Sequence, residues 1–209
     1  MYVVDRDFGF APNPFHGTCT LATCKPPIRK HARIGDWVIG MGGRRLKSTG
    51  RCVYAMRVTL VLTFNEYWAN EAFFDKRPVR NGSRVMMVGD NIYHRDQRDH
   101  EWMQLDSHHS LPDGSPNPLN INKDTKVDRV LISQDFFYFG RTAPPVPLEL
   151  LQSIGFKNKI GHLKFDTEEC TDLLNWIRNH KEAKNRIAGD PYDFNESERR
   201  YSGRASRLS

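Results

Sequence analysis

The segment Ile34-Gly35-Asp36-Trp37-Val38-Ile39-Gly40 predicts a Gly-Asp turn that feeds an apolar strand. Gly42 and Gly43 end this strand, and residues 51–64, rich in Val, Leu, Tyr and Thr, predict a second, longer strand. Residues 28–32 before the segment are typical of a single helical turn. Because so little helix separates the strands, we expect a mixed or antiparallel sheet and no doubly wound fold.

Short elements continue along the chain. Residues 111–124 contain three Pro, one Gly and three Asn, which predicts a loop. Residues 167–184 predict a C-terminal amphipathic helix, whose apolar face has the spacing i, i+3, i+4, i+7: Cys170, Leu173, Leu174 and Ile177. We therefore predict an α+β fold with a single domain over residues 1–184 and a flexible basic tail over residues 185–209.

Composition narrows the class of protein. No run of the 209 residues approaches the ~18 apolar residues of a membrane span, and the N-terminus lacks the order of a secretory signal. We therefore expect a cytoplasmic protein with no membrane partner. The cysteines are too sparse for a disulfide scaffold, and Cys19-x4-Cys24 has no second close pair beside it. We interpret all four as reduced structural thiols and predict no metal and no cofactor: Cys19, Cys24, Cys52 and Cys170.

Positive charge is concentrated in one segment. The net charge is +6, and residues 25–51 contain eight basic residues and a single acid. Such a cluster attracts phosphate-bearing partners, although a solvated basic face is the plain alternative. The residues predicted to contact phosphate are Lys25, Arg29, Lys30, Arg33, Arg44 and Arg45.

The Gly-Asp turn supports a first resemblance. Residues 35–40, with the following strand at residues 50–59, resemble the PUA-like group of small barrels, which includes the EVE, ASCH and YTH domains. The resemblance implies a compact, partly closed, mixed or antiparallel β-barrel flanked by short helices.

A more specific resemblance rests on five separated motifs that occur in order. They are Phe8-Gly9-Phe10-Ala11-Pro12-Asn13-Pro14-Phe15, Leu21-Ala22-Thr23-Cys24-Lys25-Pro26, Gly35-Asp36-Trp37, Gly89-Asp90-Asn91-Ile92-Tyr93 and Asp106-Ser107-His108-His109-Ser110. Together they resemble the second family of nucleotide-modification-associated domains. That resemblance implies a role beside DNA base modification or anti-phage defence, and it leaves the reaction open.

The loop at residues 8–16 combines aromatic faces, an amide and an imidazole. Aromatic rings stack on a base while amides read its polar edge, so this composition fits a pocket for a base. Packing of the phenylalanines into the core is the plain alternative. With residues from the later motifs, the predicted base or nucleotide contacts are Phe8, Phe10, Asn13, His16, Trp37, Asn91, Tyr93 and His108.

Two polar clusters could instead support acid–base chemistry. The candidate catalytic groups are Asp90, His94, Asp106, His108 and His109, and their spacing matches no established metal motif. Two main hypotheses follow for a partner that is nucleic acid or a free nucleotide. The first is a reader of a modified base; the alternative is an enzyme, metal-independent or metal-assisted, that processes a base or nucleotide. A hydrogen bond of Asp90 or Asp106 to a histidine in the cleft of Phe10 would favour the enzyme, whereas engagement of these groups with backbone partners would favour the reader. A third possibility is an interaction subunit that uses the tail.

Overall fold

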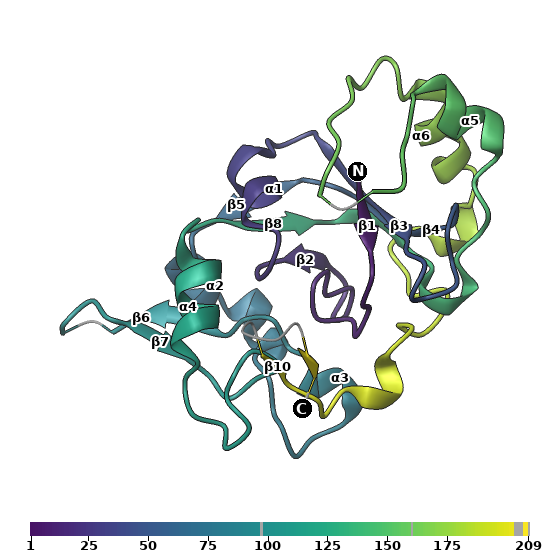
Figure 1. The fold of residues 1–209 in the computed structure, drawn as a ribbon. Coiled ribbons are helices and arrows are strands. Elements are labelled where there is room, and N and C mark those ends of the chain that lie inside the picture. Colours follow the sequence, from purple (N-terminus) through teal and green to yellow (C-terminus); the bar gives the residue numbers. More distant parts are fainter. Residues whose placement is uncertain (97, 160, 203–206, 209) are drawn as a thin grey trace.

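The computed structural model describes residues 1–96, 98–159, 161–202 and 207–208 (Figure 1). The strands are β1 (Tyr2–Val4), β2 (Cys19–Leu21), β3 (Trp37–Gly42), β4 (Cys52–Arg57), β5 (Leu60–Leu62), β6 (Tyr93–Arg95), β7 (Trp102–Gln104), β8 (Val130–Ser133), β9 (Asp135–Tyr138), β10 (Tyr201–Ser202) and β11 (Arg207–Leu208). The α-helices are α1 (Pro26–His31), α2 (Phe64–Ala69), α3 (Arg84–Met87), α4 (Pro118–Thr125), α5 (Leu148–Ser153) and α6 (Thr171–Arg178). The 3-10 helices are η1 (Glu71–Lys76), η2 (Gly140–Thr142), η3 (Lys181–Ala183) and η4 (Phe194–Glu196).

Two sheets form the centre of the molecule. The first has the order β1-β3-β4-β9, with β1 parallel to β3 and the other pairs antiparallel. The second has the antiparallel order β2-β8-β5. The long strand predicted over residues 51–64 is divided between these sheets. The division falls at Val58, whose N–H donates to Asp36 of the first sheet's turn, while Thr59 donates to Ile132 of the second sheet.

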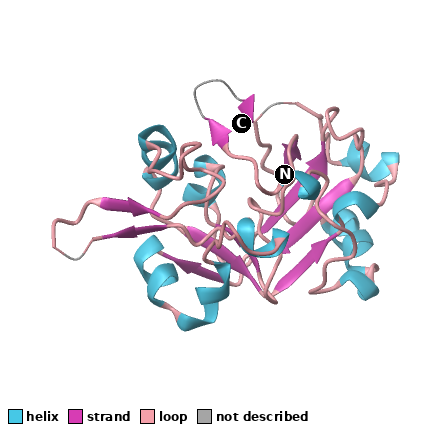
Figure 2. Cartoon of the chain, turned by 90° about the horizontal axis from the view of Figure 1, so that it is seen from below, coloured by secondary structure: helices cyan, strands magenta, loops and turns pink. Residues whose placement is uncertain are grey.

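The α+β class is confirmed, but the PUA-like barrel is not. Among the described residues the strands form separate sheets and do not close into a barrel. The hairpin β6–β7 projects from the body, and helices flank the two central sheets (Figures 1 and 2). Within the same residues, no helix is long and apolar enough to cross a bilayer.

The predicted C-terminal amphipathic helix is confirmed in a shorter form, α6. Its residues Leu173, Leu174 and Ile177 are buried and join the core cluster of the first sheet. A second core cluster is rich in aromatic side chains and contains Phe8 and Phe10 of the N-terminal loop. Both phenylalanines are therefore packed in the core, as the plain alternative predicts.

Residues 111–124 are not all loop, so that prediction is wrong at its C-terminal end. The helix α4 begins at Pro118, and the side chain of Asn117 accepts hydrogen bonds from the N–H groups of Leu119 and Asn120. An Asn cap followed by Pro at the first helical position is a favourable helix start, and it outweighs the loop-like composition.

The segment after residue 184, for which the sequence predicts a flexible tail, contacts the domain as far as residue 201. Phe136 donates its N–H to the side chain of Asn185, and Ile187 pairs with Tyr138 of β9. Phe194 is buried in the aromatic cluster. An amide side chain, a backbone bridge and the buried Phe194 ring thus attach this mainly polar segment to the body.

Candidate active site

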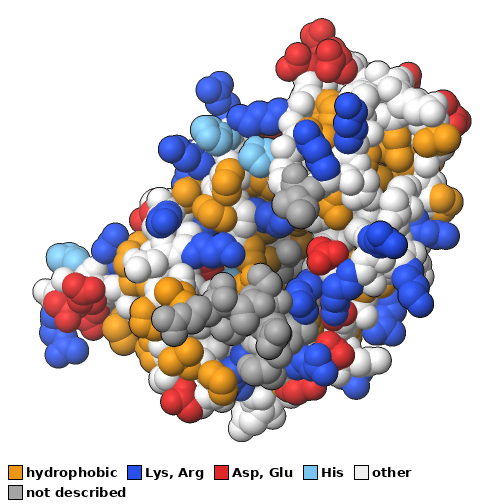
Figure 3. Space-filling model, viewed as in Figure 1, with side chains coloured by type: hydrophobic (Ala, Val, Ile, Leu, Met, Phe, Trp, Pro, Cys, Tyr) orange, Lys and Arg blue, Asp and Glu red, His pale blue; other side chains and the backbone are white. Residues whose placement is uncertain are grey.

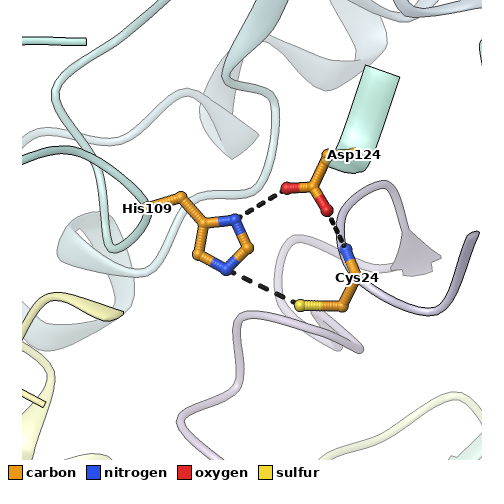
Figure 4. A group of neighbouring side chains, drawn as sticks. All are labelled: Cys24, His109 and Asp124. Atoms are coloured by element: carbon orange, nitrogen blue, oxygen red, sulfur yellow. Dashed lines mark hydrogen bonds and ion pairs between the residues drawn. The ribbon is translucent and has the colours of Figure 1, made fainter. Parts of the chain in front are cut away.

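Three side chains from distant parts of the chain meet in one group (Figure 4). The Sγ atom of Cys24 lies 3.6 Å from Nε2 of His109, and Nδ1 of His109 lies 2.7 Å from a carboxylate oxygen of Asp124. The other carboxylate oxygen of Asp124 accepts the N–H of Cys24 at 2.9 Å. Because Nδ1–H donates to Asp124, the Nε2 atom that faces the thiol is the one that can accept its proton.

The backbone at Cys24 is held in an unusual conformation. Cys24 and Lys25 both have positive φ angles, 58° and 41°, which are left-handed conformations that non-glycine residues rarely adopt. This turn connects β2 to α1, and Pro26 directly after it cannot continue a strand ladder. Backbone strain of this kind is typical of functional sites.

Arg29 fixes this turn from inside the protein. Its side chain is fully buried and donates to four carbonyl oxygens, those of Cys24, Asp124, Val127 and Arg129. The guanidinium therefore ties the cysteine turn to the end of α4. Every contact is with the protein itself, so the predicted phosphate role does not fit Arg29.

The helix α4 carries Asp124 into the group. Asn120 and Asp124 are four residues apart, on one face of the helix, and both are buried. The Asn120 amide donates to the carbonyls of His109 (2.8 Å) and Tyr201 (3.0 Å). The hydroxyl of Tyr93 also donates to Asp124, at 3.0 Å. The histidine and the carboxylate are thus each held by a further side chain.

Charge within the group favours an ionised Asp124. Burial raises the pKa of a carboxyl, but His109 and Arg29 outweigh burial and hold the pKa of Asp124 below its ordinary value. Burial alone would lower the pKa of His109, but Asp124 and the Cys24 thiol outweigh burial and raise the pKa to about 10. The arrangement can therefore hold a proton on His109 beside the sulfur.

A small hollow gives access to the cysteine. Its volume is about 100 Å³, and the described residues that line it are Arg6, Phe8, Phe10, Ala11, Cys24, His108, His109 and Tyr201. The Phe10 ring lies 4.8 Å from that of His109, and the Phe8 ring lies 4.6 Å from that of His108. Cys24 is half-buried, whereas the other three cysteines are buried. Of the four thiols, Cys24 is therefore the accessible one.

The same three residues are of types that also bind metal ions. Their ligand atoms lie within 4.8 Å of one another, so a cation is geometrically conceivable. However, the Asp124 carboxylate contacts Nδ1 of the imidazole ring, whereas the Cys24 sulfur faces Nε2 (Figure 4). With Nδ1 bound to Asp124, the sulfur and Nε2 supply two ligands, which is fewer than the three protein ligands usual at a catalytic zinc. The set fits a nucleophile with its base better than a metal centre.

The other predicted acid–base groups, Asp90, Asp106 and His94, form no Asp–His pair within the described residues. Asp90 is buried and accepts the hydroxyls of Thr20 (2.6 Å) and Tyr67 (2.8 Å), and burial raises its pKa. Asp106 pairs with Arg200. His94 stacks on Trp68, with ring centroids 4.0 Å apart. Of the five candidate catalytic residues, only His108 and His109 line the hollow.

The predicted base-reading amides are engaged inside the protein. Asn13 donates to the carbonyl of Val88, and its side-chain oxygen accepts from Lys76 at 2.8 Å. Asn91 is fully buried and donates to two backbone carbonyls. Neither amide lines the hollow, and Tyr93 contacts it only indirectly, through Asp124.

Two further predicted base contacts lie elsewhere. His16 is exposed and lies outside the lining of the hollow. Trp37 lines a separate cavity of about 270 Å³ between α1 and residues 162–167. That cavity is lined by His31, His162 and one cysteine, Cys170, which is 7% exposed. Among the described residues, no histidine forms a hydrogen bond with Cys170. The cavity is larger than the hollow at Cys24, yet it lacks a comparable pair of reacting groups.

The remaining predicted phosphate contacts are divided over the surface. Lys25 lies 4.4 Å from the centre of the Tyr2 ring, and Arg45 pairs with Asp193. Three others are exposed: Lys30, Arg33 and Arg44. Figure 1 places α1 and the β3–β4 connection in different parts of the molecule, and Figure 3 shows Lys, Arg and His side chains gathered over the region of α1. The basic segment is thus not one continuous rim.

Sequence reasoning missed two of the three central residues. Cys24 was interpreted as structural, and Asp124 lies in a segment predicted to be loop. The Asn117-Pro118 pair is the sequence signal for the start of α4. The carboxylate of Asp124 lies near the end of this helix. No local pattern links Cys24 to residues 85 and 100 positions away.

Comparisons with known proteins agree with the second resemblance. The family model described as nucleotide modification associated domain 2 matches residues 1–198. No curated protein and no solved structure matches the chain. The match covers nearly the whole chain, including Cys24, His109 and Asp124, and the chain therefore belongs to the nucleotide modification associated domain 2 family.

Proposed function

We propose that the chain is an enzyme of nucleotide modification in which Cys24 is the nucleophile, His109 its base and Asp124 the group that orients His109. The single observation that carries this proposal is the hydrogen-bonded order thiol, imidazole, carboxylate beside an accessible hollow. Nucleophile, base and orienting group within such reach of one another are the signature of covalent catalysis.

The attack itself needs no group outside the chain and its substrate. Because the pKa of His109 is raised to about 10, the proton of the thiol–imidazole pair lies on His109 before the attack, and the sulfur forms a bond to an electrophilic carbon of the base or of a group attached to it. The displaced electron pair goes to the leaving atom or to a carbonyl oxygen, which receives the proton from His109; water, deprotonated by the neutral His109, then releases the product and restores the thiol. Asp124 stabilises the imidazolium that exists before this transfer.

The hollow favours a planar substrate. The faces of Phe8 and Phe10 bound it, and aromatic side chains hold bases by stacking. Membership in a nucleotide modification family supports a base or nucleotide as the substrate. The exposed Lys30 and Arg33 follow Cys24 closely in the chain and would meet the phosphates. We include in this proposal that the enzyme acts together with systems of DNA modification or anti-phage defence.

A reader of modified bases is the second candidate, supported by the aromatic walls of the hollow. Specific reading also needs polar groups at the base edge, whereas Asn13 and Asn91 are buried and lie outside the lining of the hollow. The expected condition is not met by Asp90 or Asp106. The enzyme is favoured because a different aspartate, Asp124, binds His109 beside Phe10.

The test is trapping of a covalent adduct. The full chain is incubated with single-stranded oligodeoxynucleotides that carry pyrimidin-2-one, whose C6 forms a long-lived adduct with an attacking thiol, or N4-acetylcytosine, which offers an acyl carbon. We expect an adduct or released acyl group that Cys24→Ser abolishes and Cys170→Ser retains. Binding that survives in Cys24→Ser, with no reaction in the unmodified protein, would support the reader and overturn the enzyme. Stoichiometric zinc that is lost in Cys24→Ser would support the metal-assisted alternative.

A further inference from the structure

Residues 199–201 run beside the hollow, which Tyr201 helps to line. This short segment follows directly on residue 198, where the match to the family model ends. The Tyr201 ring lines the hollow, 5.7 Å from the ring of His109. We call residues 199–201 the strap.

The strap is attached to the two histidines and to α4. His108 donates its Nδ1–H to the Arg199 carbonyl at 2.6 Å, and the Tyr201 N–H donates to the His108 carbonyl at 2.7 Å. Asn120 donates to the Tyr201 carbonyl. Burial and the charge of His109 lower the pKa of His108 to about 3, so this imidazole stays neutral and keeps the tautomer that the strap requires.

One side chain anchors the strap from outside. Arg200 forms an ion pair with Asp106 through both of its terminal nitrogens and also donates to the Ser107 carbonyl at 3.0 Å. The Asp106 side chain is 43% exposed, so water competes for this pair. An anchor of this kind permits local opening without unfolding of the domain.

The volume of the hollow limits what can reach the sulfur. About 100 Å³ is less than the roughly 150 Å³ of a cavity known to hold benzene in another protein. One small planar group can therefore enter from the solvent side, but a base together with its sugar and phosphate cannot. Tyr201 is the lining residue that the strap alone supplies.

We propose that Tyr201 is a specificity-determining residue, the outer wall that admits one planar group to Cys24 and excludes bulkier ones until the strap moves. This inference rests on the proposed function, because it takes Cys24 as the reacting group. It adds the class of substrate that fits the closed hollow, a small planar group projecting from a base.

Thiol labelling tests the wall without any substrate. Cys24 is alkylated with iodoacetamide, a small reagent, or converted to a mixed disulfide by 5,5′-dithiobis(2-nitrobenzoic acid), a bulky aromatic one, with release of thionitrobenzoate. Peptide mapping and Cys24→Ser identify the labelled site. We expect Tyr201→Ala to speed the bulky reagent about tenfold and the small one less than about threefold. Arg200→Ala should act in the same direction, whereas Tyr201→Phe retains the ring and should match the unmodified protein.

The matched control is Arg199→Ala. It removes the same charge one position earlier, but the Arg199 side chain pairs with Glu196 on the surface and not with Asp106. An unchanged ratio of the two rates in Tyr201→Ala, or equal effects of Arg199→Ala and Arg200→Ala, would overturn the inference. Failure of the proposed function looks different, because Cys24 would label with the expected size preference while no adduct with either oligonucleotide forms.

Discussion

Replacement of Asp124 by Asn tests how the candidate active site is held and charged. The carboxylate contacts Nδ1 of His109 at 2.7 Å, and the pKa of His109 is raised to about 10. An imidazole ordinarily titrates near 6.5, so the difference corresponds to roughly 5 kcal/mol. Coulomb's law with an effective dielectric constant of about 20 gives roughly 4 kcal/mol for unit charges about 4 Å apart. Both routes indicate that most of the shift depends on the charge of Asp124.

We therefore expect Asp124→Asn to lower the pKa of His109 by about three units or more, because the Cys24 sulfur is then left as the main group that opposes burial. The histidine would be neutral at pH 7, and alkylation of Cys24 by iodoacetamide at pH 7 would slow by about tenfold or more. The assays are NMR titration of the His109 ring and the pH dependence of the alkylation rate. Circular dichroism verifies that the variant is folded.

Asp113→Asn is the matched control, because Asp113 is an exposed acid that bonds only to Ser115. Tyr93→Phe is a milder variant, since it removes one hydroxyl donor to Asp124 and leaves the carboxylate in place. The reasoning is refuted if His109 titrates at the same pH in Asp124→Asn as in the unmodified protein, or if the alkylation rate does not change while the fold is intact.

Three further predictions follow from the same contacts. Arg29→Met should lower the free energy of unfolding by about 3–5 kcal/mol, measured by urea denaturation, because it leaves four carbonyls without their buried donor; a loss below about 1 kcal/mol would contradict this role. The raised pKa of His109 stabilises the folded state most below pH 6.5, and this contribution is lost as pH rises toward 10. Unfolding curves of the unmodified protein and of His109→Gln should converge over that range, and parallel curves would contradict the assignment. Lys30→Ala combined with Arg33→Ala should weaken binding of single-stranded DNA and reduce its salt slope by about two, whereas the same change at Arg44 and Lys47 should not; equal effects of the two pairs would place the phosphate contacts elsewhere.

The sequence predicts those parts of the site that are local and misses those that depend on long-range contacts. The aromatic loop with Phe8 and Phe10 and the residue His109 were found from composition and motif alone. Cys24 was missed because its role depends on a histidine 85 residues away, and thiols in a sparse set are usually structural.

Asp124 was missed for a different reason. The many Pro and Asn residues of segment 111–124 favour loop in a simple count, but the position of each matters more than the number. Asn117 caps a helix and Pro118 begins it, so two residues that suggested irregular structure are the ones that start α4. The same helix then places Asn120 and Asp124 on one face, toward His109.

The basic segment over residues 25–51 shows how one composition serves two purposes. The Arg29 side chain is buried and makes its hydrogen bonds inside the protein. There its charge helps to keep Asp124 ionised, and its four hydrogen bonds hold the turn of Cys24. Lys30 and Arg33, one and four residues later, are exposed. Buried and exposed cations therefore follow one another along the short helix α1 and the residues directly after it. A phosphate attracted by Lys30 and Arg33 would lie next to the turn that Arg29 holds. Attraction of the partner would thereby be coupled to the position of the Cys24 thiol.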